Sequence, residues 1–157
     1  MPTRALPRPA VEVEGSLRTW LRTTPVVGAR WYFGAPLTPT FPLGLLAVPS
    51  IVPIPGGVLP IRQATAQLDL WGEKARDRYD LGGLANELVT IIDSLPSGTE
   101  MGPAVCLGAT VISGPRFQPD PDDGKARYVL VAEFTMRPGT AVDEGSGPGL
   151  EFVESGI

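Results

Sequence analysis

The residues that could do chemistry in this 157-residue sequence are limited, since it contains no histidine and a single cysteine. The lack of histidine excludes a Ser-His-Asp or Cys-His nucleophile, a histidine-ligated zinc and a histidine proton shuttle. The lone Cys106 excludes an intramolecular disulfide and a cysteine-cluster metal site. Cys106 lies in the apolar run 104–107, which predicts a buried, unreactive thiol.

Clustered carboxylates are the next candidates for a site. Asp120, Asp122 and Asp123 precede Gly124 in an order that resembles part of a calcium loop. An EF-hand loop also requires a glutamate six residues past its glycine, and Leu130 occupies that position. Because Pro, Asp and Gly are turn-forming residues, the segment 119–124 predicts a turn and not a metal site.

Carboxylates within strands could supply an acid–base pair. Asp69 and Glu133 are the acids inside expected strands, and both share a face with Gln, Thr or Arg. That pattern is typical of a solvated sheet face, whereas a glycosidase needs two converging carboxyl groups. The mixed charges over 73–80 favour the exposed start of a helix. We therefore expect no enzyme activity, no cofactor and no metal.

Hydrophobic periodicity predicts the elements that position these groups. A helical stripe runs between about residues 9 and 25, and a longer one, with Asp80 as its cap, runs from Leu81 to Leu95. The first stripe consists of Val13, Leu17, Trp20 and Leu21. Apolar and polar residues alternate over 63–70 and 126–137, and further strands are expected over 26–34 and 105–117. The predicted fold is α+β, a mostly antiparallel sheet of about four to five strands with two helices packed on one face.

Charge and composition divide the chain at about residue 137. Residues 1–137 are expected to form a single domain, and residues 138–157 a flexible, acidic, glycine-rich tail. Four of the 17 acidic residues lie in that tail, so the remaining 13 balance the 13 basic residues and the domain is neutral. A neutral domain does not provide the positive field that nucleic-acid binding needs. No apolar run reaches the ~20 residues of a membrane span, so we expect no membrane partner.

The apolar segment 41–61 does not suit an isolated monomer. Pro49 and Pro53 remove ladder donors, which predicts an edge strand or an extended arm with few backbone partners. Such an arm is a candidate for contact with a neighbouring subunit, the alternative being a loop folded over its own core. The expected interface residues are Leu45, Leu46, Val48, Ile51, Val52, Ile54 and Trp71.

Several short motifs occur in a recognisable order between residues 9 and 138. They are the helix ending in Trp20-Leu21, then Ala29 to Pro36, Gln67 to Gly72, Leu84 to Leu88, Ser113 to Asp120 and Arg127 to Leu130. In this order the chain resembles the tail terminator (tail completion) proteins of long-tailed bacteriophages. The segment after Pro42 departs from the family pattern, which has a cleaner strand where this chain has Pro49 and Pro53.

The resemblance implies a structural virion protein without catalytic residues. Members of this family form a hexameric ring that caps the tail tube, stops tube polymerisation and provides a surface for the head-tail connector, while DNA passes through the lumen without specific binding. The expected partners are therefore a second copy, the tail-tube protein and the connector, in a virion tail at its head-proximal end, assembled in the bacterial cytoplasm. The loop 34–39 and the turn 117–125 are the candidates for axial contact, with Phe117, Asp120, Asp122, Asp123 and Lys125 as the expected residues of that turn. The alternatives are a head-completion or connector ring component, and a small ligand-binding domain.

Overall fold

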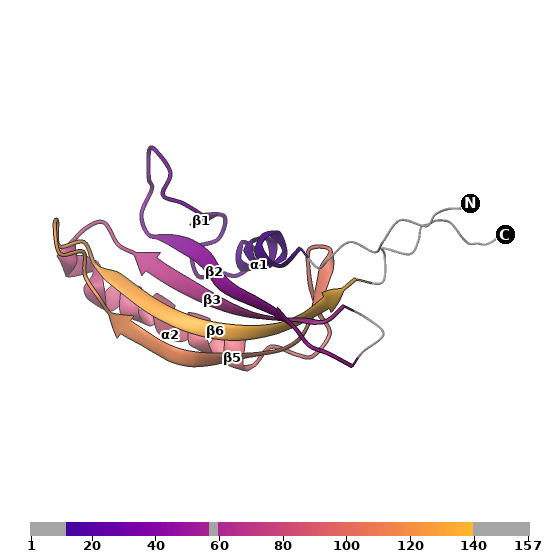
Figure 1. The fold of residues 1–157 in the computed structure, drawn as a ribbon. Coiled ribbons are helices and arrows are strands. Elements are labelled where there is room, and N and C mark those ends of the chain that lie inside the picture. Colours follow the sequence, from indigo (N-terminus) through magenta and orange to yellow (C-terminus); the bar gives the residue numbers. More distant parts are fainter. Residues whose placement is uncertain (1–11, 57–59, 140–157) are drawn as a thin grey trace.

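The computed structural model describes residues 12–56 and 60–139, which form a curved six-stranded sheet with two α-helices (Figure 1). The strand order is β1-β2-β3-β6-β5-β4. Every neighbouring pair is antiparallel except β1 and β2, which run parallel. The strands are β1 (Trp31–Tyr32), β2 (Leu43–Pro53), β3 (Arg62–Trp71), β4 (Thr99–Met101), β5 (Ala104–Phe117) and β6 (Arg127–Pro138). The α+β class is as expected, with more strands than the four to five predicted because two of them have only two or three residues.

One face of the sheet is the core face, and both helices contribute to the same core. The alternation in β3 and β6 places small and large apolar side chains on this face, where they are fully buried. They are Ala64, Ala66, Leu68 and Leu70 on β3, and Leu130, Ala132, Phe134 and Met136 on β6. Helices α1 (Val13–Leu21) and α2 (Arg78–Asp93) cover them, with the Trp20 ring meeting the Phe134 ring edge-on at 6.1 Å. Neither described helix is long and apolar enough to cross a membrane.

The start of α2 differs from the sequence prediction. Asp80 lies in the first turn of α2 and is not its cap, because the helix begins earlier, at Arg78, after a short 3₁₀ helix (Ala75–Asp77). The Asp77 carboxylate accepts a hydrogen bond from the Lys74 backbone N–H at 2.9 Å, which closes the loop before the helix. For α1, the expected start near residue 9 lies outside the described residues.

Strand β1 is much shorter than the strand predicted over 26–34. The chain between α1 and β1 turns instead, and Gly28 adopts a left-handed conformation (φ +57°) within that turn. Val26 and Val27 are buried in the turn, so their apolar character reflects packing and not strand pairing. The buried Trp31 then lies directly against Gly44 of β2.

Strand β2 corrects the prediction that segment 41–61 has few backbone partners. It pairs with β3 over its whole length, from Leu43 opposite Trp71 to Pro53 opposite Arg62. A bulge between Ala47 and Ser50 accommodates Pro49, as expected where a proline interrupts a ladder. Beyond Leu45 the outer edge of β2 has no strand partner among the described residues, so most of β2 is the edge strand that its prolines predict.

The end of the described chain extends slightly past the predicted domain boundary. Strand β6 continues to Pro138, and the Gly139 N–H donates to the Pro103 carbonyl at 2.8 Å. The rest of the acidic tail predicted over 138–157 lies outside the described residues.

Candidate functional site

The residues expected at a subunit interface separate into two groups along β2 and β3. Leu45 and Trp71 are half-buried near the end of the sheet where the β5–β6 turn lies. Ile51, Val52 and Ile54 lie toward the hairpin between β2 and β3, and they are 42%, 46% and 38% exposed. Of the other two expected residues, Val48 is half-buried at the bulge, while Leu46 is only 1% exposed. Leu46 therefore belongs to the core, because its side chain points to the helix-covered face, and we leave it out of the interface.

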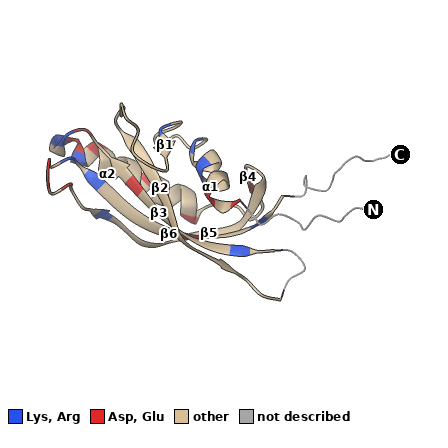
Figure 2. Ribbon diagram, turned by 45° about the horizontal axis from the view of Figure 1, so that its top comes forward, with Lys and Arg blue, Asp and Glu red and all other residues tan. Residues whose placement is uncertain are grey.

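We call the exposed part of β2 the hairpin patch. It consists of Pro49, Ile51, Val52, Pro53 and Ile54, whose side chains alternate between the two faces of the projecting end of the sheet. No charged residue occurs between residues 43 and 54, and Figure 2 shows β2 without a coloured residue. The Ile54 N–H donates to the Ile61 carbonyl at 2.9 Å, on the side of β3. Because successive backbone N–H groups of a strand point to opposite sides, the backbone nitrogen of Pro53 faces the free edge. Because a proline has no N–H, the edge cannot support a continuous ladder with an added strand. The hairpin patch is therefore suited to contact through apolar side chains.

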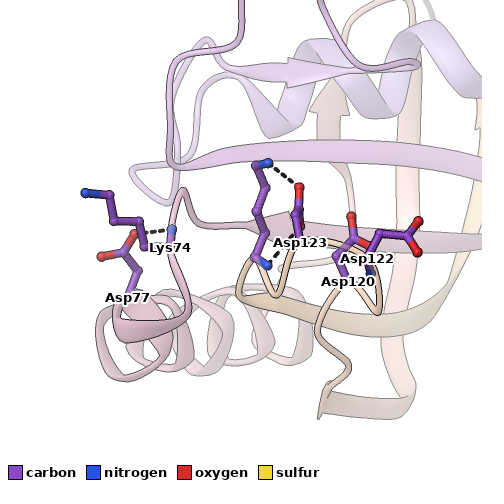
Figure 3. Close-up of polar contacts among 6 residues, drawn as sticks. Lys74, Asp77, Asp120, Asp122 and Asp123 are labelled. Carbon is purple, nitrogen blue, oxygen red and sulfur yellow. Dashed lines mark hydrogen bonds and ion pairs between the residues drawn. The ribbon is translucent and has the colours of Figure 1, made fainter.

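The turn between β5 and β6 is held by its own side chains (Figure 3). The Asp120 carboxylate accepts the Asp122 N–H at 2.9 Å, and the Asp123 carboxylate accepts the Lys125 N–H at 3.0 Å and forms an ion pair with the Lys125 ammonium. These bonds lower the pKa of Asp123 and raise the pKa of Lys125. Gly124 adopts a positive φ of 72°. The segment is thus the turn that its composition predicts, and the described residues contain no group of three potential metal ligands.

Phe117 packs against this end of the molecule. The Arg78 guanidinium lies 4.2 Å from the centre of the Phe117 ring, and the Tyr128 ring lies 5.3 Å away. A cation–π contact at this distance attaches the start of α2 to the end of β5. Phe117 is half-buried as a result, so its ring supports the turn and offers only part of its surface to a partner.

The prediction that Asp69 lies on a solvated sheet face is wrong. Asp69 is 7% exposed, and its carboxylate accepts hydrogen bonds from Arg127 at 2.7 Å (Nη2) and 3.2 Å (Nε). The Arg127 guanidinium also lies 5.1 Å from the centre of the Trp71 ring. The pair therefore fixes Trp71 at the end of β3. Glu133, the other strand acid, is half-buried with Gln63 Nε2 at 3.5 Å.

Two grooves meet at this end of the sheet. The apolar groove has a volume of about 230 Å³ and is lined by Ala35, Pro39, Phe41, Leu43, Leu45, Trp71, Asp120, Asp123 and Lys125. The acidic groove has a volume of about 220 Å³ and is lined by Phe41, Pro42, Gly72, Glu73, Asp77, Asp80, Leu81 and Leu84. Phe41 lines both grooves.

The apolar groove brings together residues that sequence analysis assigned to two different contacts. Leu45 and Trp71 were expected at a subunit interface, whereas Asp120, Asp123 and Lys125 were expected in axial contact. Asp122 lies in the same turn but does not line the groove. The acidic groove was missed, since the mixed charges of 73–80 indicated an exposed helix start and not which of them share a concave surface.

Comparison with known proteins shows a likeness in fold to a virion structure. No family model matches the chain, and no curated protein matches it. A solved structure described as the virion of a native gene transfer agent (GTA) particle contains a chain with a similar fold, at a TM-score of 0.58 and 12% identity. The match covers 82% of this chain and 99% of that chain. At this level of identity the likeness establishes a shared fold.

Proposed function

We propose that this chain is a non-catalytic structural protein of a phage-like virion, and specifically a tail terminator. The observation that carries the proposal is the fold shared with 99% of a chain from a gene transfer agent virion. The ordered motifs between residues 9 and 138, which resemble tail terminators, support the same function. The protein would cap the tail tube as a hexameric ring, stop tube polymerisation and present the joining surface for the head.

The hairpin patch is the proposed contact between neighbouring subunits of the ring. A cyclic ring uses heterologous contacts, so each subunit needs two different complementary surfaces. The hairpin patch supplies an uncharged apolar surface that cannot pair indefinitely through its backbone. The outer face of β3 or helix α2 of the neighbour would receive it.

The end of the sheet that carries the two grooves is the proposed axial surface. It combines the loop 34–39 with the β5–β6 turn, and it would face the tail-tube protein or the connector. The neutral charge of residues 1–137 suits a lumen through which DNA slides, because tight phosphate contacts would retain it. The protein would then lie in the virion tail, at its head-proximal end, after assembly in the bacterial cytoplasm.

The proposal is tested by mixing the purified chain with the purified tail-tube protein of the same virion during tube growth. Electron microscopy should show tubes of uniform length with a ring at one end. Ile51→Asp should abolish the rings because it places a charge in the hairpin patch. Ile112→Asp is the matched control, since Ile112 is a comparably exposed isoleucine (51%) on β5, outside the patch. Tubes of unrestricted length, or binding to capsids but not to tubes, would contradict the terminator function, and the second result would favour a connector ring component.

A further inference from the structure

We infer that the acidic and apolar grooves together bind a segment of a partner protein in which an arginine or lysine lies close to a large apolar side chain. The inference deepens the proposed function, on which it rests, by giving the chemistry of the axial partner. It depends on the shape and charge of the two grooves and on their common wall.

The acidic groove is suited to a long basic side chain. Three carboxylates line it, from Glu73, Asp77 and Asp80, and no lysine or arginine does. The ion pairs of the described residues involve other acids, Asp123 and Asp69, so no described basic side chain lies within 4 Å of these three carboxylates. Asp77 is partly engaged by the Lys74 N–H, and Glu73 is close enough to Lys125 to help raise the pKa of that ammonium group. Among the described residues, neither Asp80 nor Glu73 has an ion pair within 4 Å. A guanidinium or ammonium group would find charge-assisted acceptors here.

The rest of the acidic groove is apolar. Its lining includes Phe41, Pro42, Leu81 and Leu84, of which Leu81 is buried and the others are half-buried. Lysine and arginine have long aliphatic stems that pack on such surfaces while the charged end stays near water. The acidic groove therefore fits a lysine or arginine side chain better than a free cation.

The apolar groove is suited to a large uncharged side chain. Trp71, Leu43 and Leu45 line it together with Phe41 from the β1–β2 loop. Lys125 lines it too, but its ammonium group is paired with Asp123, so the charges at this part of the rim compensate each other. Aromatic and aliphatic pockets of this kind are the usual places where a partner inserts an anchoring side chain.

The two grooves are close enough for one segment to reach both. Phe41 lines each of them. The Gly72 N–H at the wall of the acidic groove donates to the Ala126 carbonyl at 2.9 Å, which joins the end of β3 to the residue before β6. Figure 3 shows the Lys74–Asp77 loop and the Asp120–Asp123 turn at the same end of the molecule. Lys74, Arg76 and Arg78 lie in the same segment but do not line the acidic groove. The carboxylates that do line it repel phosphates, so the groove itself favours a protein segment over a nucleic acid.

The test uses the complete isotope-labelled protein and three acetylated, amidated peptides followed by NMR titration. The probe has the sequence Arg-Gly-Leu, and the matched peptides replace Arg by Glu or Leu by Ser. The probe should bind most tightly and shift the amide signals around Phe41, Gly72 and Trp71. Equal binding of the Glu peptide, or shifts confined to other surfaces, would overturn the inference, as would the absence of saturable binding by the probe.

Substitutions in the two grooves should weaken probe binding separately. Glu73→Gln combined with Asp80→Asn should weaken it about three- to tenfold, because two exposed ion pairs would be lost and each contributes modestly in water. Glu87→Gln, at an exposed acid of α2 outside the grooves, should leave it unchanged. For the apolar groove, Leu45→Lys should abolish binding, whereas Ala47→Lys, on the same strand and face, should not. Equal effects of a groove variant and its control would refute the inference.

The tube-capping assay separates this inference from the function on which it rests. If the wild-type protein caps tubes but the groove variants cap them equally well and the probe does not bind, the groove inference fails and the terminator function stands. If the probe binds as expected but tubes are never capped, the terminator function fails and the binding chemistry of the grooves stands. Circular dichroism of each variant confirms that it is folded.

Discussion

We expect the stability of the fold to require a glycine at residue 44, because its backbone lies directly against the Trp31 ring. Gly44 lies where β1 runs parallel to β2, and its N–H donates to the Arg30 carbonyl at 2.8 Å. The same junction holds the loop between β1 and β2, because Arg30 Nε donates to the Pro42 carbonyl at 2.7 Å. Phe41, the residue before Pro42, lines both grooves. A substitution at residue 44 therefore tests how the sheet edge and the site are held together.

The structure gives the size of the effect of Gly44→Ala. A Cβ at residue 44 would lie 2.6 Å from Cδ2 of Trp31 and closer still to Cε3 and Cζ3. Carbon atoms in contact are normally about 3.5–4.0 Å apart, so the ring would have to move by about 1 Å. Trp31 is 0% exposed, which leaves it no free space. Overpacking of this kind costs about 1–3 kcal/mol, and we expect about 3 kcal/mol here, a fall in Tm of roughly 6–12 °C for a chain of this length.

Urea denaturation followed by circular dichroism measures this loss. The control is Gly34→Ala, because a Cβ at Gly34 would meet no atom within 4 Å, and its free energy of unfolding should stay within about 0.5 kcal/mol of wild type. A double-mutant cycle isolates the contact: with Trp31→Leu already present, Gly44→Ala should cost less than about 1 kcal/mol. The reasoning is refuted if Gly44→Ala is as stable as wild type, or if its cost is the same with and without Trp31.

Three further predictions concern single interactions. Arg127→Met should destabilise the fold by about 3–5 kcal/mol because it leaves the buried Asp69 carboxylate without its cation, with only the Gln67 amide donating to it at 3.1 Å. Adding Asp69→Leu should recover most of that loss in the same denaturation assay. Burial raises the pKa of the Cys106 thiol above its ordinary value of 9.0, so the folded state holds its proton more tightly than the unfolded state. The contribution of Cys106 to the free energy of unfolding should therefore be constant below about pH 9 and fall above it, and Cys106→Ala should remove that part of the slope. Finally, the Asp93 carboxylate accepts the Val111 N–H at 3.0 Å on the outer edge of β5, so Asp93→Ala should accelerate hydrogen exchange at Val111 and leave β6 amides unchanged.

Side-chain periodicity predicted the elements whose burial is regular. The alternation over 63–70 corresponds to β3, and the stripe from Leu81 corresponds to α2, because each buries one face against a continuous core. These patterns are local, so they are visible in the sequence. The prediction of a strand over 26–34 was wrong for most of its length. Val26 and Val27 are buried in a turn, and apolar character alone does not distinguish residues packed in a turn from residues paired in a strand.

Contacts between residues far apart in the sequence could not be predicted from local patterns. The burial of Asp69 depends on Arg127, 58 residues further along the chain, and nothing in the local alternation identifies that partner. Likewise, the acidic groove needs Phe41 to approach the start of α2, which follows only from the register of β2 on β3. The candidate turn residues were found because turns have local composition, whereas the grooves beside them are products of topology.

The arrangement of the two proposed contacts constrains how a ring could be built. In a ring, equivalent points on neighbouring subunits are separated by roughly the width of a subunit, so a protruding side chain and the site that receives it must be far apart on one chain. Leu37, which is fully exposed, lies on the same loop as Ala35 and Pro39, which line the apolar groove. It is therefore too close to that groove to fill the equivalent groove of the next subunit. The hairpin patch, by contrast, is about seven residues along β2 from Leu45, or about 23 Å at 3.3 Å per residue. Lateral contact through the hairpin patch would thus leave the β1–β2 loop and both grooves free for a second protein, and a ring in which Leu37→Ser abolishes subunit association would require a different assignment.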